Sequence, residues 1–460
     1  MRKVCLATLV AALQGGMALG AAPEIKPTFD LRLRGEGVYT PARTAASDQT
    51  YDFTLGRFRL GLDAVWKHWT LHGMVQAAGA MGLPENGAFA AGPVYLTAND
   101  GDTRPSRLGI AELNAVYTNG GFRTVLGRQA FAEGFEAPTG VGHLDAVKQR
   151  RLSDRLVGNF EWPNVARRFD GASFGWGAGG AHLAGFVLRP LDGAFDHKDA
   201  FEPLDDVSVY GLTLTGEHGA WIPGSEVRVF AVQYEDGRPA ARRQAGGDLS
   251  LTTAGASFLT GNDTWDLLLW GVVQRGDWGA TSQEAWAYLF DIGRRFPGLP
   301  GKPSLHLALE QSSGDDLGDD HGTFFNLLPT NHKFYGSMDY FAFSNLRDLY
   351  AEALFTVNER LRGRFAVHDF SLTETTDAWY GGSGAFEEES FGYLIRIPPG
   401  GRYPSEDMGR EADLELTFTL PQGFGLGVGG GYFWGGAAAE AFLPMESDGS
   451  WTYVELTWRR

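Results

Sequence analysis

The sequence predicts an all-β protein, a transmembrane antiparallel outer-membrane β-barrel of about 18 strands. Three observations predict this fold class. Glycine (64 residues) and aromatic residues (31 Phe, 15 Tyr and 13 Trp) are abundant, which fits strands joined by tight turns better than helices. Segments of about ten residues alternate apolar and polar side chains along the chain. Tight turns alternate with long loops, which is the connectivity of outer-membrane barrels.

The N-terminus has the features of a secretory signal peptide. Residues 1–20 begin Met-Arg-Lys, continue with an apolar stretch from Val4 to Leu13, and end with small residues around Ala18 and Gly20. Such a segment is removed on export, and its apolar stretch is too short to span a bilayer. We expect cleavage after residue 20 or after residue 22. The single cysteine, Cys5, lies in this segment, so we expect no disulfide framework in the mature protein.

The remaining residues, 21–460, are predicted to form one β-barrel domain. Phe29, Leu31 and Leu33 alternate with Asp30, Arg32 and Arg34, and the same period of two recurs to the end of the chain. Period two means a strand with one apolar and one polar face. The predicted strands lie near 28–39, 52–65, 68–80, 108–118, 121–130, 166–177, 180–189, 205–218, 226–236, 247–259, 262–276, 281–293, 303–313, 346–357, 360–372, 408–420, 423–435 and 448–459.

The connections between these strands differ in length. Tight turns are marked by Trp66-Lys67, Asn119-Gly120, Asn358-Glu359 and Pro421-Gln422, whereas long loops lie near 81–107, 131–165, 314–345 and 373–407. We expect the long loops to be extracellular. A soluble β-sandwich would explain the alternation, but not an even strand count, unequal loops and a signal peptide together. We expect the sheet to close into a barrel because lipid offers no hydrogen-bond partner for an unpaired strand edge.

Aromatic residues near the strand ends, among them Trp221, Trp434 and Trp451, fit the girdles that line both membrane interfaces. Eighteen strands enclose a lumen that side chains alone do not fill. The sequence therefore predicts a water-accessible pore.

Composition and motifs exclude several other functions. The net charge of -17 argues against a nucleic-acid partner, because phosphate binding needs clustered cations. No known catalytic motif occurs in the structural context that its chemistry needs, so we expect no enzyme and no cofactor. A Ser/His/Asp site on the rim of the barrel is not excluded by the sequence. The acidic run 315–320 could bind Ca²⁺, but it lacks the alternating spacing of a calcium loop, and a solvated loop is the preferred interpretation. We name no metal ligand.

Arginines on the polar faces of strands are the most informative feature. Arg57 and Arg59 share one such face, Arg362 and Arg364 share another, and the most basic stretch runs from 148 to 155. Lumenal guanidinium groups can bind carboxylates or phosphates in a bidentate manner. The residues that we place along the solute path on this basis are Arg34, Arg57, Arg59, Arg128, Arg150, Arg151, Arg362 and Arg364. Equally, these arginines could pair with acids such as Asp30, Asp63, Glu112 and Asp170, and both interpretations remain open.

Two stretches are more specific than the alternation. The first contains Leu126-Gly127-Arg128-Gln129, Arg155-Leu156-Val157-Gly158, Trp162-Pro163-Asn164 and Arg167-Arg168-Phe169-Asp170; the second is Leu328-Pro329-Thr330-Asn331-His332-Lys333-Phe334-Tyr335-Gly336, followed by Asp339. Both are similar to motifs of the alginate-export family of outer-membrane porins. The resemblance implies an eighteen-stranded barrel with an arginine-rich constriction that passes an anionic polyuronate. It also implies that Arg128, Arg155, Arg167 and Asp170 are pore or loop-anchoring groups.

The sequence departs from the family pattern in two places. Phe334 stands where the family loop usually has Tyr, and Arg459-Arg460 follow Trp458 where such barrels usually end in an aromatic residue. The second departure concerns the assembly signal and not the fold.

The loop 314–345 is too apolar to be freely solvated. We expect it to pack inward as a lid and narrow the pore; contact with lipopolysaccharide or a partner is the alternative. The lid residues that we single out are Phe324, Phe325, Pro329, His332, Tyr335 and Asp339.

The sequence thus predicts a channel in the outer membrane of a Gram-negative bacterium. Its expected role is passive export or diffusion of an anionic polysaccharide, such as an alginate-like polyuronate, or of anionic sugars. An uptake porin for unrelated small nutrients and a non-conducting structural or enzymatic barrel are the alternatives. Expected partners are outer-membrane lipid, lipopolysaccharide and the anionic solute, and a periplasmic partner in an export complex stays open.

Overall fold

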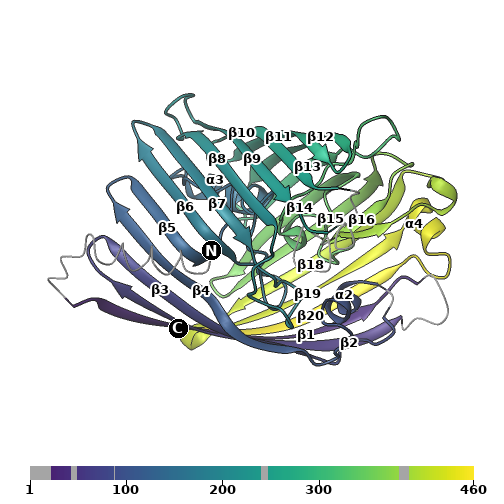
Figure 1. Cartoon of the computed structure of the whole chain (residues 1–460), viewed down its shortest axis with the longest axis horizontal. Helices are drawn as coiled ribbons and strands as arrows, with labels where there is room; N and C mark the ends of the chain where they lie inside the picture. Colours follow the sequence, from purple (N-terminus) through teal and green to yellow (C-terminus); the bar gives the residue numbers. More distant parts are fainter. Residues whose placement is uncertain (1–21, 43–48, 88, 240–246, 383–392) are drawn as a thin grey trace.

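Eighteen antiparallel strands form one closed barrel (Figure 1). The computed structural model describes residues 22–42, 49–87, 89–239, 247–382 and 393–460, so the expected signal peptide lies outside the described residues. The strands of the barrel are β1 Glu24–Tyr39, β2 Thr50–Val65, β3 Trp69–Met81, β4 Ser106–Asn119, β5 Phe122–Gln129, β6 Phe169–Ala178, β7 Ala181–Pro190, β8 Val207–Gly216, β9 Ser225–Asp236, β10 Leu249–Gly261, β11 Trp265–Trp278, β12 Thr281–Arg295, β13 Ser304–Ser312, β14 Leu346–Asn358, β15 Leu361–Leu372, β18 Asp407–Thr419, β19 Phe424–Gly435 and β20 Gly449–Arg459.

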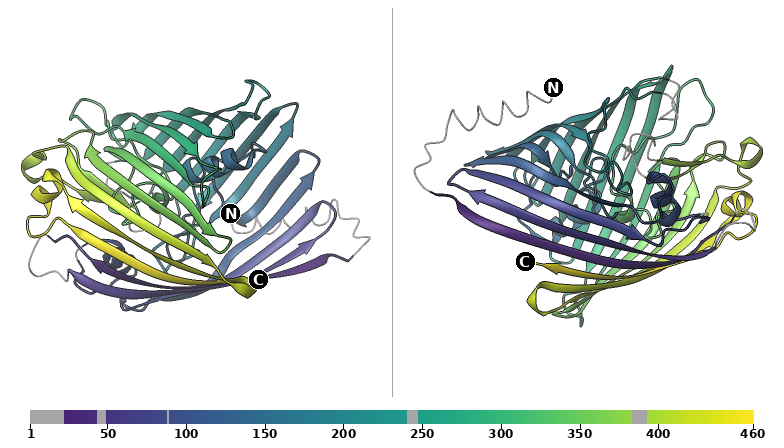
Figure 2. Two further views of the ribbon diagram at one scale, coloured as in Figure 1. Left: turned by 180° about the vertical axis from the view of Figure 1, so that it is seen from behind. Right: turned by 60° about the horizontal axis from the view of Figure 1, so that its bottom comes forward.

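The first and last strands close the barrel. β1 pairs with β2 along its whole length and with β20 from Asp30 to Tyr39, and the purple and yellow strands lie side by side in Figures 1 and 2. The predicted barrel and its strand count are confirmed, and each of the eighteen predicted segments corresponds to one of these strands.

The wall has an apolar outer face and a polar inner face, as the alternation predicted. Leu33, Phe58 and Val454 are 45%, 40% and 55% exposed on the outside, whereas Arg34 and Arg57 are buried inside. An apolar outer band is the surface that lipid requires. Among the described residues, no helix is both long and apolar enough to cross a membrane.

Trp451 corrects the expected aromatic girdle. Trp221 and Trp434 are exposed, but Trp451 is only 5% exposed, and its indole nitrogen donates to Glu36. The reason is the period of two: Trp451 shares the inner face with Tyr453, while Val454 points outward. Proximity to a strand end therefore does not fix the face.

The connections at the two ends of the barrel differ in length. At the end that we call the short-turn end they span 66–68, 120–121, 179–180, 217–224, 262–264, 296–303, 359–360 and 420–423. At the opposite, long-loop end they span 40–49, 82–105, 130–168, 191–206, 237–248, 279–280, 313–345, 373–406 and 436–448. The hairpin at 279–280 is as tight as any short turn, and Gly279 adopts a φ of 64° there.

Several long loops fold into the barrel. They carry helices α2 (Ala91–Ala98) and α3 (Gly142–Arg151), and α3 lies inside the ring of strands in Figure 1. Val157 and Leu328, from two different loops, form a parallel bridge and are fully buried. At the long-loop end, β16 (Trp379–Gly382) pairs with β17 (Tyr393–Arg396), and α4 (Ala437–Phe442) packs against β18. The core of the protein is thus the barrel lumen itself, filled by its own loops.

Candidate functional site

Four arginines on β1 and β2 form a basic surface on the inner wall, which we call the arginine patch. They are Arg32, Arg34, Arg57 and Arg59, each at most 7% exposed. Arg32 lies directly opposite Arg57 in the antiparallel register, and Arg59 lies opposite Asp30. Because residues in register share a face, the patch follows directly from the alternation of two neighbouring strands.

The chain fills this patch with a carboxylate of its own. The loop 130–168, which we call the Glu161 loop, brings the Glu161 side chain within 3.1 Å of Arg57, 2.9 Å of Arg59 and 2.7 Å of Arg168. The same side chain is still 37% exposed. Burial alone would raise the pKa of the Glu161 carboxyl, but Arg168, Arg59 and Arg57 outweigh it and hold that pKa well below its usual range.

Backbone carbonyls complete the contact between this loop and the patch. Arg32 donates to the carbonyl oxygens of Glu161 at 2.9 Å and Pro163 at 2.8 Å, and Arg34 donates to that of Trp162 at 3.0 Å. Charge-assisted hydrogen bonds of this kind are about twice as strong as neutral ones. The patch therefore binds oxygen acceptors from several directions at once.

A second inward loop meets the first at Trp162. The loop 313–345, which we call the lid loop, stacks the His332 ring on Trp162 with centroids 3.7 Å apart and planes at 7°. The Trp162 ring also contacts Arg34, whose guanidinium carbon lies 3.7 Å from the ring centroid. The His332 ring is oriented by Asp339, whose carboxylate lies 2.9 Å from Nδ1. Arg34, Trp162 and His332 thus join the wall and both loops in one contact.

The lid loop packs into the interior. Phe324, Phe325 and Tyr335 are buried, and the carbonyl oxygens of Leu328 and Pro329 accept hydrogen bonds from Arg167 at 2.7 Å and 3.2 Å. Whether this loop opens and closes the path stays a prediction.

Three acids on β18 hold the tip of the lid loop. The backbone N–H groups of Met338 and Ser337 donate to Glu411 at 3.0 Å and to Asp413 at 3.2 Å. The Ser337 hydroxyl lies 3.1 Å from Glu415. β18 lies three strands from β1 along the wall, so an acidic surface and the arginine patch each bind one inward loop.

The arginines of the basic stretch are paired with acids on the strands. Arg151 lies 2.8 Å from Asp291 and 2.9 Å from Glu352, and Arg155 lies 2.7 Å from Glu310. Arg150 contacts Glu352 at 3.4 Å. These pairs attach the Glu161 loop to β12, β13 and β14.

Arg364 and Arg362 face inward on β15. Arg364 is held by Glu352 at 2.7 Å and Glu415 at 2.8 Å. Arg362 has the same parity but lies next to the turn at 359–360 and is exposed. Only Arg362 of this pair is open to water at the short-turn end.

Arg128 and Asp170 do not line the lumen. They form a bidentate pair, at 2.8 Å and 3.0 Å, between β5 and β6. Arg128 lies between Leu113 of β4 and Asp170 of β6 in the register, so the three side chains share one face. Leu113 is 52% exposed on the outer face. The alternation therefore puts this pair on the outside of the wall near the long-loop end, where each charge satisfies the other.

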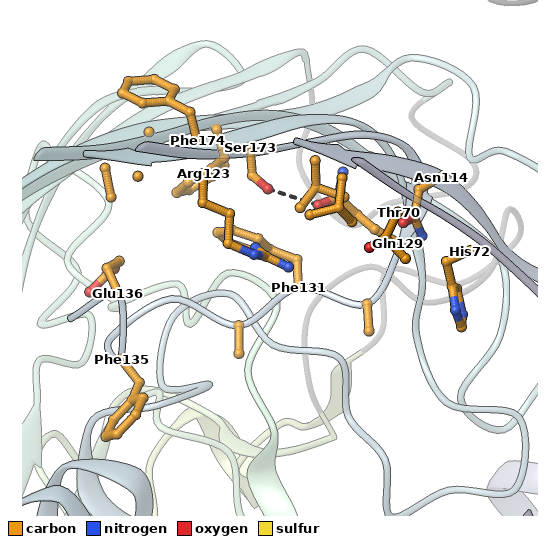
Figure 3. Close-up of a pocket in the computed structure, with 18 of the residues that line it drawn as sticks. Thr70, His72, Asn114, Arg123, Gln129, Phe131, Phe135, Glu136, Ser173 and Phe174 are labelled. Carbon is orange, nitrogen blue, oxygen red and sulfur yellow. Dashed lines mark hydrogen bonds between the residues drawn. The ribbon is translucent and has the colours of Figure 1, made fainter. Parts of the chain in front are cut away.

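An open cavity leads from the short-turn end toward the patch. It has a volume of about 610 Å³ and lies between strands β2 to β8 and the start of the Glu161 loop. Figure 3 shows Arg123 and Gln129 reaching into it from the strands, with Glu136 on the other side. Glu112 lines this cavity and accepts a hydrogen bond from Arg168 at 3.0 Å. Through Arg168 the cavity adjoins the carboxylate of Glu161.

The family model for alginate export matches residues 126–452, which is more than half of the chain. The chain belongs to the alginate export family. This family and the closed barrel place it in the outer membrane of a Gram-negative bacterium as a channel protein. A comparison with curated protein sequences gives no match.

Solved outer-membrane porins share the fold of this family member. OpdK from Pseudomonas aeruginosa is 11% identical, with a TM-score of 0.55 over 95% of this chain and 99% of that one. OccK2 (OpdF) from the same organism, solved in complex with glucuronate, is 11% identical, with a TM-score of 0.56 over 96% and 99%. A BenF-like porin from Pseudomonas fluorescens Pf-5 is 9% identical, with a TM-score of 0.59 over 96% and 99%.

Glu161 is the residue that sequence reasoning missed. It carries no motif of its own, and its partners Arg57 and Arg59 lie about a hundred residues earlier in the chain. The available signal was its neighbour Trp162, the first residue of the Trp-Pro-Asn motif. Arg32 and Arg168 belong to the same site and were not among the predicted path residues.

Proposed function

We propose that this protein is a passive channel for anionic sugars or an alginate-like polyuronate, without enzymatic activity. The observation that carries the proposal is the Glu161 carboxylate, held by three guanidinium groups on the lumenal side of the wall. A site that binds one carboxylate in this way has the chemistry to bind another of the same kind. A uronate residue presents such a carboxylate.

Conduction requires contacts that are weak or numerous enough for the solute to leave. The patch meets this requirement because its four arginines lie side by side on β1 and β2, so a carboxylate can pass from one to the next. The exposed Arg123, in the cavity, and Arg362 extend positive charge toward the short-turn end. OccK2, which shares the fold, was solved in complex with glucuronate, and this supports a uronate as the solute here.

Small anionic sugars are the favoured form of the solute. The lid loop and the Glu161 loop meet at the stack of Trp162 and His332 inside the barrel, so a polymer needs these loops to separate. A single sugar needs less space than a chain. Block by oligouronates of increasing length distinguishes the two, because a sugar-sized path loses affinity beyond the first few units.

We further propose that the long-loop end faces the outside of the cell and the short-turn end faces the periplasm. Outer-membrane barrels have this arrangement of short periplasmic turns and longer extracellular loops. The outer loops then meet lipopolysaccharide, and a periplasmic partner in export would meet the short-turn end, close to Arg362.

Ion selectivity in a planar bilayer tests the proposal. Wild-type channels are expected to prefer anions at low salt, and the double variant Arg57→Ala with Arg59→Ala is expected to shift the reversal potential toward cations. Arg128→Ala is the matched control, because it removes an arginine from the outer face of the wall. Cation preference in the wild type, or an equal shift in the control, would overturn the role of the patch.

A further inference from the structure

Three side chains with metal-binding chemistry meet on the inner wall near the short-turn end. They are Asp266 on β11, Asp291 on β12 and His306 on β13. Asp266 lies opposite Gly293 in one register and His306 lies opposite Gly293 in the next. Asp291, two residues before Gly293, shares the same face. Three neighbouring strands therefore each contribute one ligand to a single spot.

Gly293 leaves room for the other three side chains. A Cβ atom at this position would collide with the Asp266 carboxylate and would lie 2.5 Å from Cε1 of His306. The row Asp266, Gly293 and His306 thus consists of two ligands with an empty place between them. Any side chain other than hydrogen at Gly293 would fill it.

The distances suit one small cation. Nδ1 of His306 lies 2.8 Å from Asp291 Oδ1 and 3.8 Å from Asp266 Oδ1, and one ligand atom from each residue lies within 4.8 Å of the others. Zinc bonds of about 2.0–2.1 Å in a tetrahedron separate two ligand atoms by roughly 3.3 Å. The two measured distances bracket that value, so small side-chain rotations bring the atoms into place.

The Asp266 carboxylate needs a partner. It is 2% exposed, and neither of its oxygens has a hydrogen-bond partner among the described residues. Asp291, by contrast, is held through Oδ2 by Arg151 at 2.8 Å, which leaves Oδ1 directed at His306. A buried charge without a partner costs several kcal/mol, so such groups are paired or bind metals.

We propose that Asp266, Asp291 and His306 bind a divalent cation of the zinc class beneath helix α3. Two carboxylates with an imidazole fit Zn²⁺ and its neighbours Co²⁺ and Ni²⁺, whereas Ca²⁺ and Mg²⁺ take oxygen ligands. The three residues supply three positions, and the fourth belongs to water. None of the three ligands belongs to the arginine patch, and their chemistry is the same whichever solute the channel carries.

Metal binding is coupled to α3 through Arg150. Its guanidinium lies 3.3 Å from Nε2 of His306 and 3.4 Å from Glu352. When Nδ1 of His306 holds the metal, Nε2 carries the proton and no longer accepts from Arg150. The arginine then keeps only its contact with Glu352, so the bound cation changes how Arg150 of α3 is held on the wall.

Calorimetric titration with Zn²⁺ alone tests the site. The protein is purified without a histidine tag and treated with a chelator before Zn²⁺ is added. Wild type is expected to bind one ion per chain, and Asp266→Asn and His306→Gln are each expected to bind at least tenfold more weakly. Asp263→Asn is the matched control, because it removes an exposed acid three residues away and should bind like wild type.

A second measurement uses only the wild-type protein and so does not depend on variants that fold. The visible spectrum of the Co²⁺-loaded protein should show the strong bands of a four-coordinate ion, and Zn²⁺ should remove them. Absence of stoichiometric binding overturns the proposal. Equal affinity in Asp266→Asn also overturns it, and a six-coordinate spectrum contradicts the proposed four-coordinate site.

Discussion

Replacing Glu161 by Gln tests whether the chain's own carboxylate competes with the solute. Gln keeps the size of the side chain and its oxygen acceptor, but it removes the negative charge that lies within 3.1 Å of Arg57, Arg59 and Arg168. The variant therefore leaves three guanidinium groups with less neutralisation. We expect it to bind glucuronate more tightly than wild type.

The size of the effect follows from Coulomb's law. One unit charge about 4 Å from another contributes about 4 kcal/mol at an effective dielectric near 20. Water reaches the 37% exposed side chain of Glu161. Asp30 and Glu455 neutralise part of the patch, and Glu112 neutralises part of the charge of Arg168. We therefore expect about a third of this energy, about 1.4 kcal/mol, which is roughly a tenfold gain in affinity.

The assay is block of single-channel current by glucuronate, with glucose as the neutral solute. Salt is kept low, because surface charges are screened beyond about 8 Å at physiological ionic strength. Glu202→Gln serves as control, since it removes a carboxylate that pairs with Arg107 outside the patch. Unchanged or weaker block in Glu161→Gln, with normal conductance, would refute competition between Glu161 and the solute.

Three further predictions concern pH, the gate and topology. A lowered carboxyl pKa means that the ion pairs of Glu161 are complete above the usual Glu pKa of about 4.3 and weaken only below it. Glucuronate block should therefore differ between Glu161→Gln and wild type by the same factor at pH 7 and pH 5, and a difference that disappears at pH 5 contradicts this pKa. Trp162→Ala removes the ring between Arg34 and His332 and should raise single-channel conductance, whereas Trp434→Ala on the outer face should not; equal conductances exclude the stack as a barrier. A cysteine at Asn358 should react with an impermeant reagent only after the outer membrane is permeabilised, and one at Gly382 should react on intact cells; the reverse pattern inverts the orientation.

The strands could be predicted because their pattern is local. Lipid outside and water or loops inside select one face each, so Leu33 and Arg34 are assigned by their neighbours alone. The same rule placed Arg57, Arg59 and Arg364 on the inner face. The prediction for Arg128 and Asp170 was wrong, because a position at a strand end and a motif do not say which face of the wall a side chain takes.

Contacts between distant segments could not be predicted, because loops have no period. Glu161 reaches Arg57 across a hundred residues, and the short helices in the long loops gave no amphipathic pattern. The cluster of Asp266, Asp291 and His306 depends on the register of three strands. A shift of one residue would separate these side chains. Strand prediction that is uncertain by a few residues at each end cannot fix that register.

The arginines of the lumen divide according to where their partners lie, and this division matters more than the net charge of -17. Arg151 and Arg155 are paired with Asp291 and Glu310, which are fixed in the wall, so an entering anion cannot replace these partners without breaking a buried pair at a cost of about 3–5 kcal/mol. Arg57 and Arg59 are paired with Glu161, a loop carboxylate that is 37% exposed, so an anion that replaces it leaves the pairs of Arg151 and Arg155 intact. In the proposed function, selectivity for anions therefore depends on the arginine patch rather than on the more basic stretch from 148 to 155.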